Sequence, residues 1–361
     1  MQTATAVPAI QAPGCVRLAP LVAAAARAPR IGGRNGATYR ELPCRSVLNR
    51  CDSPRMPFEW TINPYRGCEL ACRYCYARYT HEYIGLPDTR LFETEIFAKA
   101  GAAEALERDL PPGKPLRGNI AIGTATDPYQ PAERKFMVTR RLLEVFARRE
   151  GLSLSLTTKS DLVVRDIDLI VEIGKRNRIS VNVTITTLSR ALARLIEPRA
   201  PRPALRLQAV RALASAGIST GVFIMPVLPG ITDLPATLEV IAAASARAGA
   251  SYLAHQVLFL RSSAKKEFYP FLAEHFPRLA PRYRRTYGAT ERHTPEYREK
   301  VDALVAALRR RHGLEPRAYC DGDAEEEECG MGTSIPAQRA AAGDHPSHRA
   351  VAAGGQMALT F

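Results

Sequence analysis

Short apolar runs alternate with amphipathic stretches through the middle of the chain. Six runs predict strands, at residues 60–63, 119–126, 152–159, 179–187, 221–228 and 252–260. Five of them precede stretches with apolar residues at helical spacing, at 138–149, 167–175, 203–216, 235–248 and 268–275. Repeated strand–helix units predict parallel strands joined by right-handed crossovers. The simplest arrangement is an α/β fold, a partial (βα)6 TIM-type barrel.

Two further helices are expected outside this pattern. Residues 96–108 have room for a helix between the first two strands. Residues 294–313 predict a late helix, because Pro295 lies near its start and Gly313 at its end.

The pattern divides the chain into four segments. They are a flexible basic arm at 1–43, the barrel at 44–276, a C-terminal helical extension at 277–320 and a disordered acidic tail at 321–361. The two ends lack lasting periodicity, which is typical of segments that cannot bury a core. The longest apolar stretch, 18–26, is too short to cross a membrane, so we expect a protein without a membrane partner.

Composition supports a folded chain. Hydrophobic residues make up 46% and charged residues 24% of the 361 residues, close to the average of globular proteins. These values argue against a mainly disordered, collagenous or coiled-coil chain. A soluble enzyme or a binding protein remains.

Charge is unevenly distributed along the sequence. The formal net charge is +14; the first 40 residues hold five arginines and no acid, while residues 321–361 hold seven acids and two arginines. The excess in the middle is compatible with a polyanionic partner such as nucleic acid. The alternative is a biased genome, since only eight of the 50 basic residues are lysine.

Three of the eight cysteines lie close together, directly after the first predicted strand. Cys68, Cys72 and Cys75 have the spacing C-x3-C-x2-C, which suits a metal centre in a reducing compartment such as the cytoplasm. Two kinds of centre are possible. His81 would complete a Cys3His zinc site, whereas three thiolates alone would hold a cubane iron–sulfur cluster with one open iron.

The other five cysteines have no compact spacing. They are Cys15, Cys44, Cys51, Cys320 and Cys329, and we interpret them as incidental rather than as ligands of a second cluster.

The cysteine loop resembles that of a known family. C-x3-C-x-aromatic-C, with Tyr74 as the aromatic residue, in the loop after the first strand of a six-unit barrel, resembles the radical S-adenosylmethionine (radical SAM) superfamily. The stretches at 56–67, 81–86, 123–131, 157–160 and 197–201 resemble its spore photoproduct lyase-like branch, often labelled DNA repair photolyases. The resemblance runs from about residue 46 to residue 313 and leaves out both tails.

The resemblance implies a cofactor set. Cys68, Cys72 and Cys75 would hold a [4Fe-4S] cluster whose fourth iron binds S-adenosylmethionine, and Tyr74 would lie beside the adenine. One electron, from a flavodoxin- or ferredoxin-like reductant, would cleave the sulfonium and release a 5′-deoxyadenosyl radical. That radical would abstract hydrogen from the substrate.

Polar residues at other strand ends are candidates for binding the cofactor. They are Thr124, Asp127, Lys159, Ser160, Asn182 and Thr184. Asp127 could instead cap the next element, and Lys159 could be a surface residue in a turn. Glu197 and Arg199 could form either a structural ion pair or part of a substrate site.

The sequence departs from the family in one respect. Spore photoproduct lyases return hydrogen to the thymine radical from a cysteine outside the cluster loop, and this chain has no cysteine between Cys75 and Cys320. Tyr129 could donate hydrogen instead. Two hypotheses remain: a radical enzyme that acts on a nucleic acid or another macromolecule, and a non-catalytic zinc- or cluster-binding protein that binds nucleic acid. The length of the barrel favours the enzyme.

Overall fold

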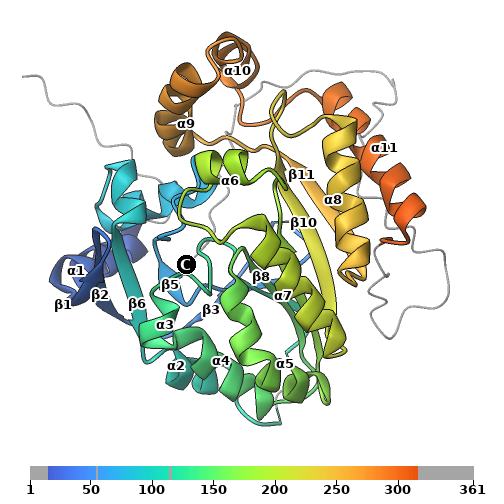
Figure 1. Ribbon diagram of the computed structural model, residues 1–361. Helices are drawn as coiled ribbons and strands as arrows, with labels where there is room; N and C mark the ends of the chain where they lie inside the picture. Colours follow the sequence, from blue (N-terminus) through green and yellow to red (C-terminus); the bar gives the residue numbers. More distant parts are fainter. Residues whose placement is uncertain (1–14, 54–55, 114–115, 316–361) are drawn as a thin grey trace, which may run out of the picture.

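A seven-stranded sheet forms the centre of the computed structural model, which describes residues 15–53, 56–113 and 116–315 (Figure 1). Six parallel strands follow one another in chain order, and a short antiparallel strand adds one edge. The strands are β3 (Leu48–Arg50), β4 (Trp60–Ile62), β7 (Asn119–Ile122), β8 (Ser153–Thr158), β9 (Arg178–Thr184), β10 (Ser219–Val227) and β11 (Tyr252–Val257). The predicted partial (βα)6 barrel is confirmed.

Helices cover the outer face of this sheet. They include α3 (Glu133–Phe136), α4 (Val138–Ala147), α5 (Ile167–Gly174), α7 (Pro203–Ser215) and α8 (Pro235–Arg247), with the 3-10 segment η3 (Asp161–Asp166). Leu154, Val181 and Val222 point from the strands into the main core beneath these helices. Burying the alternate residues of each strand on this side leaves the other residues to form an inner face.

The N-terminal segment is folded, which corrects the prediction of a flexible arm for its described part. Residues 15–43 form α1 (Cys15–Arg27), β1 (Arg30–Arg34) and β2 (Ala37–Pro43), while residues 1–14 lie outside the described residues. Asn35 and Gly36 both have positive φ and connect β1 to β2. Asn-Gly is a strong hairpin signal, and the arm prediction overlooked it.

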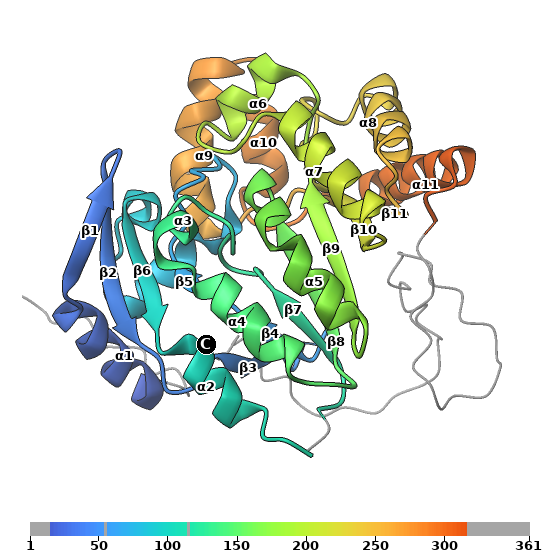
Figure 2. The ribbon, with the colours of Figure 1, turned by 60° about the horizontal axis from the view of Figure 1, so that its bottom comes forward.

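A second correction concerns the helix expected at 96–108. Its first residues form the strand β6 (Glu95–Ala100), which pairs in parallel with β2, and α2 (Ala102–Asp109) begins only after Gly101. The buried Ile96, Phe97 and Ala98 pack within the second sheet, of order β1-β2-β6-β5, in which β5 is Tyr65–Arg66. Figure 2 shows this sheet and α1 beside the barrel.

Helices at the carboxyl ends of the barrel strands and beyond complete the described chain. They are η1 (Tyr76–Ile84), η2 (Thr89–Glu93), α6 (Arg190–Ile196), α9 (Ser262–His275), α10 (Ala280–Tyr287) and α11 (Pro295–His312). Helix α11 packs on the edge of the main sheet, because Val301, Val305 and Leu308 belong to the main core. The predicted tail at 321–361 lies outside the described residues, and in the described part no helix is long and apolar enough to span a membrane.

Candidate functional site

The cysteine loop leaves β4 and is fixed by close backbone contacts. Gly67 has a φ of +82°, and a Cβ there would lie 2.8 Å from the Glu95 carbonyl oxygen and 2.9 Å from that of Phe92. The Cys68 amide donates to the same Phe92 oxygen at 2.8 Å. Only glycine suits this position, since it must combine a left-handed backbone with a close approach. The loop is therefore built tightly against η2 and β6.

Cys68, Cys72 and Cys75 lie together in an apolar setting. Cys68 and Cys72 are 9% and 8% exposed and belong to the hydrophobic cluster around Phe268, and the half-buried Cys75 packs against this cluster. Burial raises the pKa of each of the three thiols. Thiolates in such a setting need the positive charge of a bound metal centre. The donor set thus fits an iron–sulfur cluster held by one short loop.

His81 has a structural role instead of completing a zinc site. Its imidazole is fully buried, its Nε2–H donates to the Glu95 carbonyl at 2.9 Å, and its ring packs edge-on against Phe92 and Phe97. Burial lowers the pKa of His81 to about 4. Among the described residues, no three His, Cys, Asp or Glu side chains are close enough to hold one metal ion. Through these contacts, His81 supports the cysteine loop.

Tyr74 is anchored through its hydroxyl group. The phenol donates to Glu197 Oε1 and lies 3.2 Å from Thr186 Oγ1, which also donates to Glu197 at 2.9 Å. Glu197 pairs with Arg206 at 2.6 Å, and both side chains are almost completely buried. The ion pair that the sequence allowed between Glu197 and Arg199 is thus made with Arg206.

Asp127 fixes the turn after β7. Its Oδ1 accepts from the Tyr129 amide at 2.9 Å and from Thr158 Oγ1 at 2.7 Å, and its Oδ2 accepts from the Lys159 amide at 2.7 Å. Burial raises the pKa of Asp127, and these hydrogen bonds lower it by a smaller amount. The carboxylate is therefore used within the protein, as the capping alternative expected.

Lys159 is differently placed. Its ammonium group lies 5.9 Å from the centre of the Tyr74 ring, on the side of the cysteine loop. It is close enough to Cys72 and Cys75 to lower the pKa of both thiols, an effect smaller than that of their burial. Lys159 thus brings a positive charge to the cysteines.

The remaining candidates divide between capping and the inner face. Ser160 caps η3 by accepting from the Leu162 amide at 3.2 Å, and Thr124 accepts from Asn63 at 3.1 Å. Asn182 and Thr184 are buried on the inner side of β9, opposite Val181 and Val183. The alternation predicted for this strand is confirmed.

Some residues at the loop were missed from the sequence. Glu69 accepts hydrogen bonds from the Tyr39 hydroxyl at 3.0 Å and the Ala132 amide at 2.8 Å. Gln130 accepts from the Glu69 amide at 3.0 Å and donates to the Gly67 carbonyl at 3.1 Å. The signal in the sequence was an acidic residue between two of the cysteines, but the hydrogen-bond partners of Glu69 are distant in sequence.

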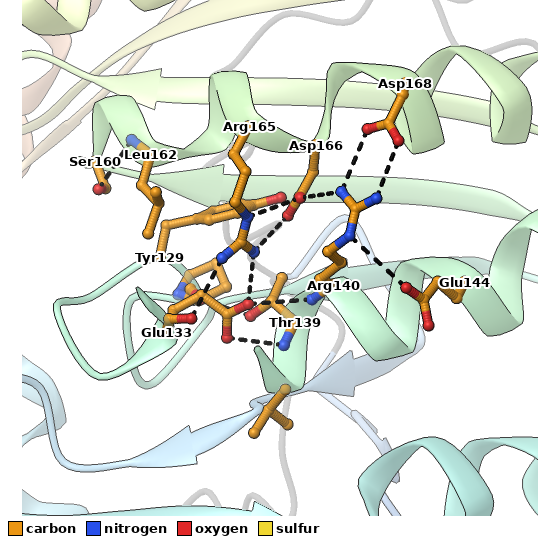
Figure 3. A network of polar contacts seen from close by, with 12 residues as sticks. Tyr129, Glu133, Thr139, Arg140, Glu144, Ser160, Leu162, Arg165, Asp166 and Asp168 are labelled. Atoms are coloured by element: carbon orange, nitrogen blue, oxygen red, sulfur yellow. Dashed lines mark hydrogen bonds and ion pairs between the residues drawn. The ribbon is translucent and has the colours of Figure 1, made fainter. Parts of the chain in front are cut away.

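A second polar network lies behind the turn after β7 (Figure 3). Arg165 bridges Glu133 at 2.8 Å and Asp166 at 2.7 Å, and Arg140 contacts Asp166 at 2.6 Å. Tyr129, the alternative hydrogen donor, is 1% exposed, with its ring 5.9 Å from the Arg165 guanidinium. Its burial in this network makes Tyr129 unsuited to meet a substrate.

Comparisons with known proteins cover the segment that carries this site. Residues 62–241 match the model of the radical SAM superfamily. An uncharacterized protein of Mycobacterium tuberculosis (strain ATCC 25618 / H37Rv) is 36% identical over 304 residues, covering 84% of this chain and 86% of the relative. One of Methanocaldococcus jannaschii is 31% identical over 222 residues, covering 61% and 77%.

The fold has solved counterparts. A spore photoproduct lyase complexed with dinucleoside spore photoproduct has a TM-score of 0.54 at 14% identity, covering 86% of this chain and 85% of the other. A variant of the lyase with bound AdoMet and the same dinucleoside has a TM-score of 0.55, with the same identity and coverage. The chain belongs to the radical SAM superfamily, and it is an enzyme that uses a [4Fe-4S] cluster and S-adenosylmethionine.

Proposed function

We propose that this enzyme reductively cleaves S-adenosylmethionine and uses the resulting radical to abstract hydrogen from a nucleic acid. The observation that carries the cleavage of S-adenosylmethionine is the buried cysteine loop, with Lys159 and Tyr74 beside it. The net charge of +14 supports a nucleic acid as the substrate. When bound, the cluster and S-adenosylmethionine supply a 5′-deoxyadenosyl radical. The chain's own residues hold these groups and keep water away.

The side chains take distinct roles in this proposal. Cys68, Cys72 and Cys75 ligate the cluster, and the Lys159 ammonium group pairs with the carboxylate of S-adenosylmethionine. The Tyr74 ring lies beside the adenine, since Glu197 and Thr186 already take up its hydroxyl. Preorganising these groups in an apolar site strengthens their electrostatic effect.

The other candidates support the cofactor in two ways. Thr124, Asn182 and Thr184 contact it from the strand ends. Asp127 and Ser160 act through the backbone of the turn that carries Lys159, to which Asp127 is hydrogen-bonded. A flavodoxin- or ferredoxin-like protein delivers the electron in the cytoplasm.

Repair of spore photoproduct itself is not expected. The sequence has no cysteine between Cys75 and Cys320 to return hydrogen to a thymine radical, and Tyr129 is buried in the network of Figure 3. The proposed reaction is therefore a hydrogen abstraction with another outcome.

Anaerobic reconstitution tests the proposal. The protein should bind about four irons and four sulfides per chain, and dithionite should then release 5′-deoxyadenosine slowly from S-adenosylmethionine. Cys72→Ala should lose the cluster, whereas Cys51→Ala, at an equally buried cysteine, should keep it. Stoichiometric zinc without iron uptake, or a reduced, fully loaded protein that forms no deoxyadenosine, would overturn it.

A further inference from the structure

Along strands β8 to β11, the inner face of the main sheet is mostly polar and carries no charge. The residues that alternate with the buried outer ones are Ser153, Ser155 and Thr157 on β8, Ser180, Asn182 and Thr184 on β9, Ser219, Gly221, Phe223 and Met225 on β10, and Tyr252, Ala254 and Gln256 on β11. None of them is ionisable at neutral pH apart from the weakly acidic tyrosine. In a chain that is 24% charged, this face suits an uncharged, hydrogen-bonding group.

One layer of this face is organised around Tyr252. Thr157, Asn182, Gly221 and Tyr252 lie side by side in register on four neighbouring strands. The Tyr252 hydroxyl donates to Asn182 Oδ1 at 2.5 Å, and Asn182 Nδ2 donates to Ser155 Oγ at 2.9 Å. Ser155, Thr157 and Tyr252 remain partly exposed, so this layer offers both an aromatic ring and polar groups to a ligand.

Exposed arginines lie on two helices whose buried residues belong to the same hydrophobic cluster as the cysteine loop. Helix α6 and the segment after it expose Arg190, Arg194, Arg199 and Arg202, and α10 with the segment before it exposes Arg278, Arg282, Arg284 and Arg285. We call these eight residues the arginine rim. Ile196 of α6 and Tyr283 of α10 pack in the same hydrophobic cluster as Cys68 and Cys72, and α6 lies near α9 in Figures 1 and 2.

The arginine rim has little negative charge to balance it. Residues 277–290 contain no acid, and Glu197 is the one acid among residues 189–202. Glu197 is buried and paired with Arg206, so its charge is not available to the surface. Asp233 and Arg282 both affect the pKa of His293, so one acid from another segment lies near the α10 part of the rim. The eight arginines still leave the rim with an excess of positive charge.

We propose that the arginine rim binds the phosphodiester backbone of a nucleic acid, while the inner face receives one of its bases. This rests on the proposed function and adds the surface and the recognised group. One guanidinium group can donate two parallel hydrogen bonds to the oxygens of one phosphate, which makes arginine well suited to such a backbone. An acidic protein could meet the rim but would leave the uncharged inner face unused. A nucleic acid uses both, because it combines a charged backbone with uncharged bases.

Binding of fluorescein-labelled 20-nucleotide single-stranded DNA and RNA, followed by fluorescence anisotropy over a range of salt, tests the rim. The double variant R282E/R285E should weaken binding at least tenfold at low salt, and the slope of log K against log[salt] should become shallower by about 0.7 for each phosphate group that the variant no longer neutralises. R211E/R247E is the matched control, because it makes the same change of charge at exposed positions on α7 and α8. The control should change binding much less.

A second measurement tests the inner face. The wild type should bind an ordinary oligonucleotide more tightly than one of equal length with abasic sites, and Tyr252→Ala should remove this preference while the salt slope stays the same. If the rim alone bound the bases, Tyr252→Ala would keep the preference for the ordinary oligonucleotide over the abasic one. That result would overturn the role of the inner face.

The remaining outcomes separate the rim from the chemistry. Equal losses of binding in the rim and control variants would overturn the rim proposal. So would a rim variant that still binds nucleic acid but no longer binds poly-glutamate as a competitor, because the rim would then be a site for acidic protein. Folding of the rim and control variants is checked by their iron content and their uncoupled release of 5′-deoxyadenosine, which should match the wild type, and folding of Tyr252→Ala is checked by its far-UV circular dichroism. Rim-dependent binding in a protein that never forms deoxyadenosine would refute the proposed function and leave the rim in place.

Discussion

Gly221→Ala should destabilise the protein although its backbone tolerates a side chain. Gly221 does not have positive φ, so alanine meets no backbone strain there. A Cβ at this position would lie 2.2 Å and 2.4 Å from two carbon atoms of the Tyr252 ring. The ring must move, and its movement breaks the hydrogen bond from the Tyr252 hydroxyl to Asn182.

The expected loss is the sum of two effects. Overfilling a packed site costs about 1–3 kcal/mol, and a lost hydrogen bond costs about 1 kcal/mol. Gly221→Ala should therefore lower the free energy of unfolding by about 2–4 kcal/mol. In a Tyr252→Ala background the clash is absent, so the same change should cost less than about 0.5 kcal/mol.

Urea denaturation of the metal-free protein, followed by far-UV circular dichroism and by the fluorescence of Trp60, measures both values. Gly174→Ala is the control, because a Cβ there meets only Ile179 at 3.7 Å, an ordinary contact. The control should leave stability unchanged or raise it by up to about 1 kcal/mol. An equal loss from Gly221→Ala with and without Tyr252 would refute the placement of Tyr252 across β10.

Three further predictions concern the support of the cysteine loop. Burial lowers the pKa of His81 from 6.5 to about 4, so between these pH values only the unfolded chain takes up a proton at this residue. The free energy of unfolding should therefore fall by about 3 kcal/mol as the pH drops from 6.5 to 4. In His81→Gln, the urea midpoint should depend less on pH over this range. Glu197→Gln leaves the Arg206 charge buried without a counterion, so the free energy of unfolding should drop by about 3–5 kcal/mol, unlike that of the exposed pair variant Glu172→Gln. Gly67→Ala should prevent iron uptake during anaerobic reconstitution, because its Cβ meets backbone oxygens; normal uptake would show that the loop can yield.

The barrel could be predicted because its pattern is local and repeated. Each strand alternates or is apolar over several residues, and helical spacing follows, so element type and order could be inferred without knowing any long-range contact. The N-terminal sheet could not be predicted in this way. Its strand β2 pairs with β6, which lies more than 50 residues further along the chain. Strand β6 is followed directly by the helix α2, and the sequence prediction took both as one helix.

The polar candidate residues were harder to interpret from the sequence than the cysteine loop. The cysteine loop identifies itself, because one short segment holds all three thiols. The role of Asp127 depends on Thr158 and on the Lys159 amide, which belong to the next strand unit. A polar residue at a strand end can thus bind a ligand or a neighbouring turn, and only the three-dimensional contacts distinguish these roles.

The contacts of Glu69 make the N-terminal sheet part of the functional site. The family model begins at residue 62, yet the carboxylate that directly follows Cys68 is held on one oxygen by Tyr39 from β2 and on the other by the Ala132 amide. His81, which donates to Glu95 of β6 in the same sheet, also lies against Gly67 of this loop, because a Cβ at Gly67 would be 3.0 Å from His81 Cε1. Because the N-terminal sheet and the barrel both contact this loop, its cysteines can be held in place before any cluster binds. This limits the conformational entropy that the loop loses on cluster binding. The sheet whose first strands were predicted as a flexible arm is thus a second support for the loop that carries the three cysteines.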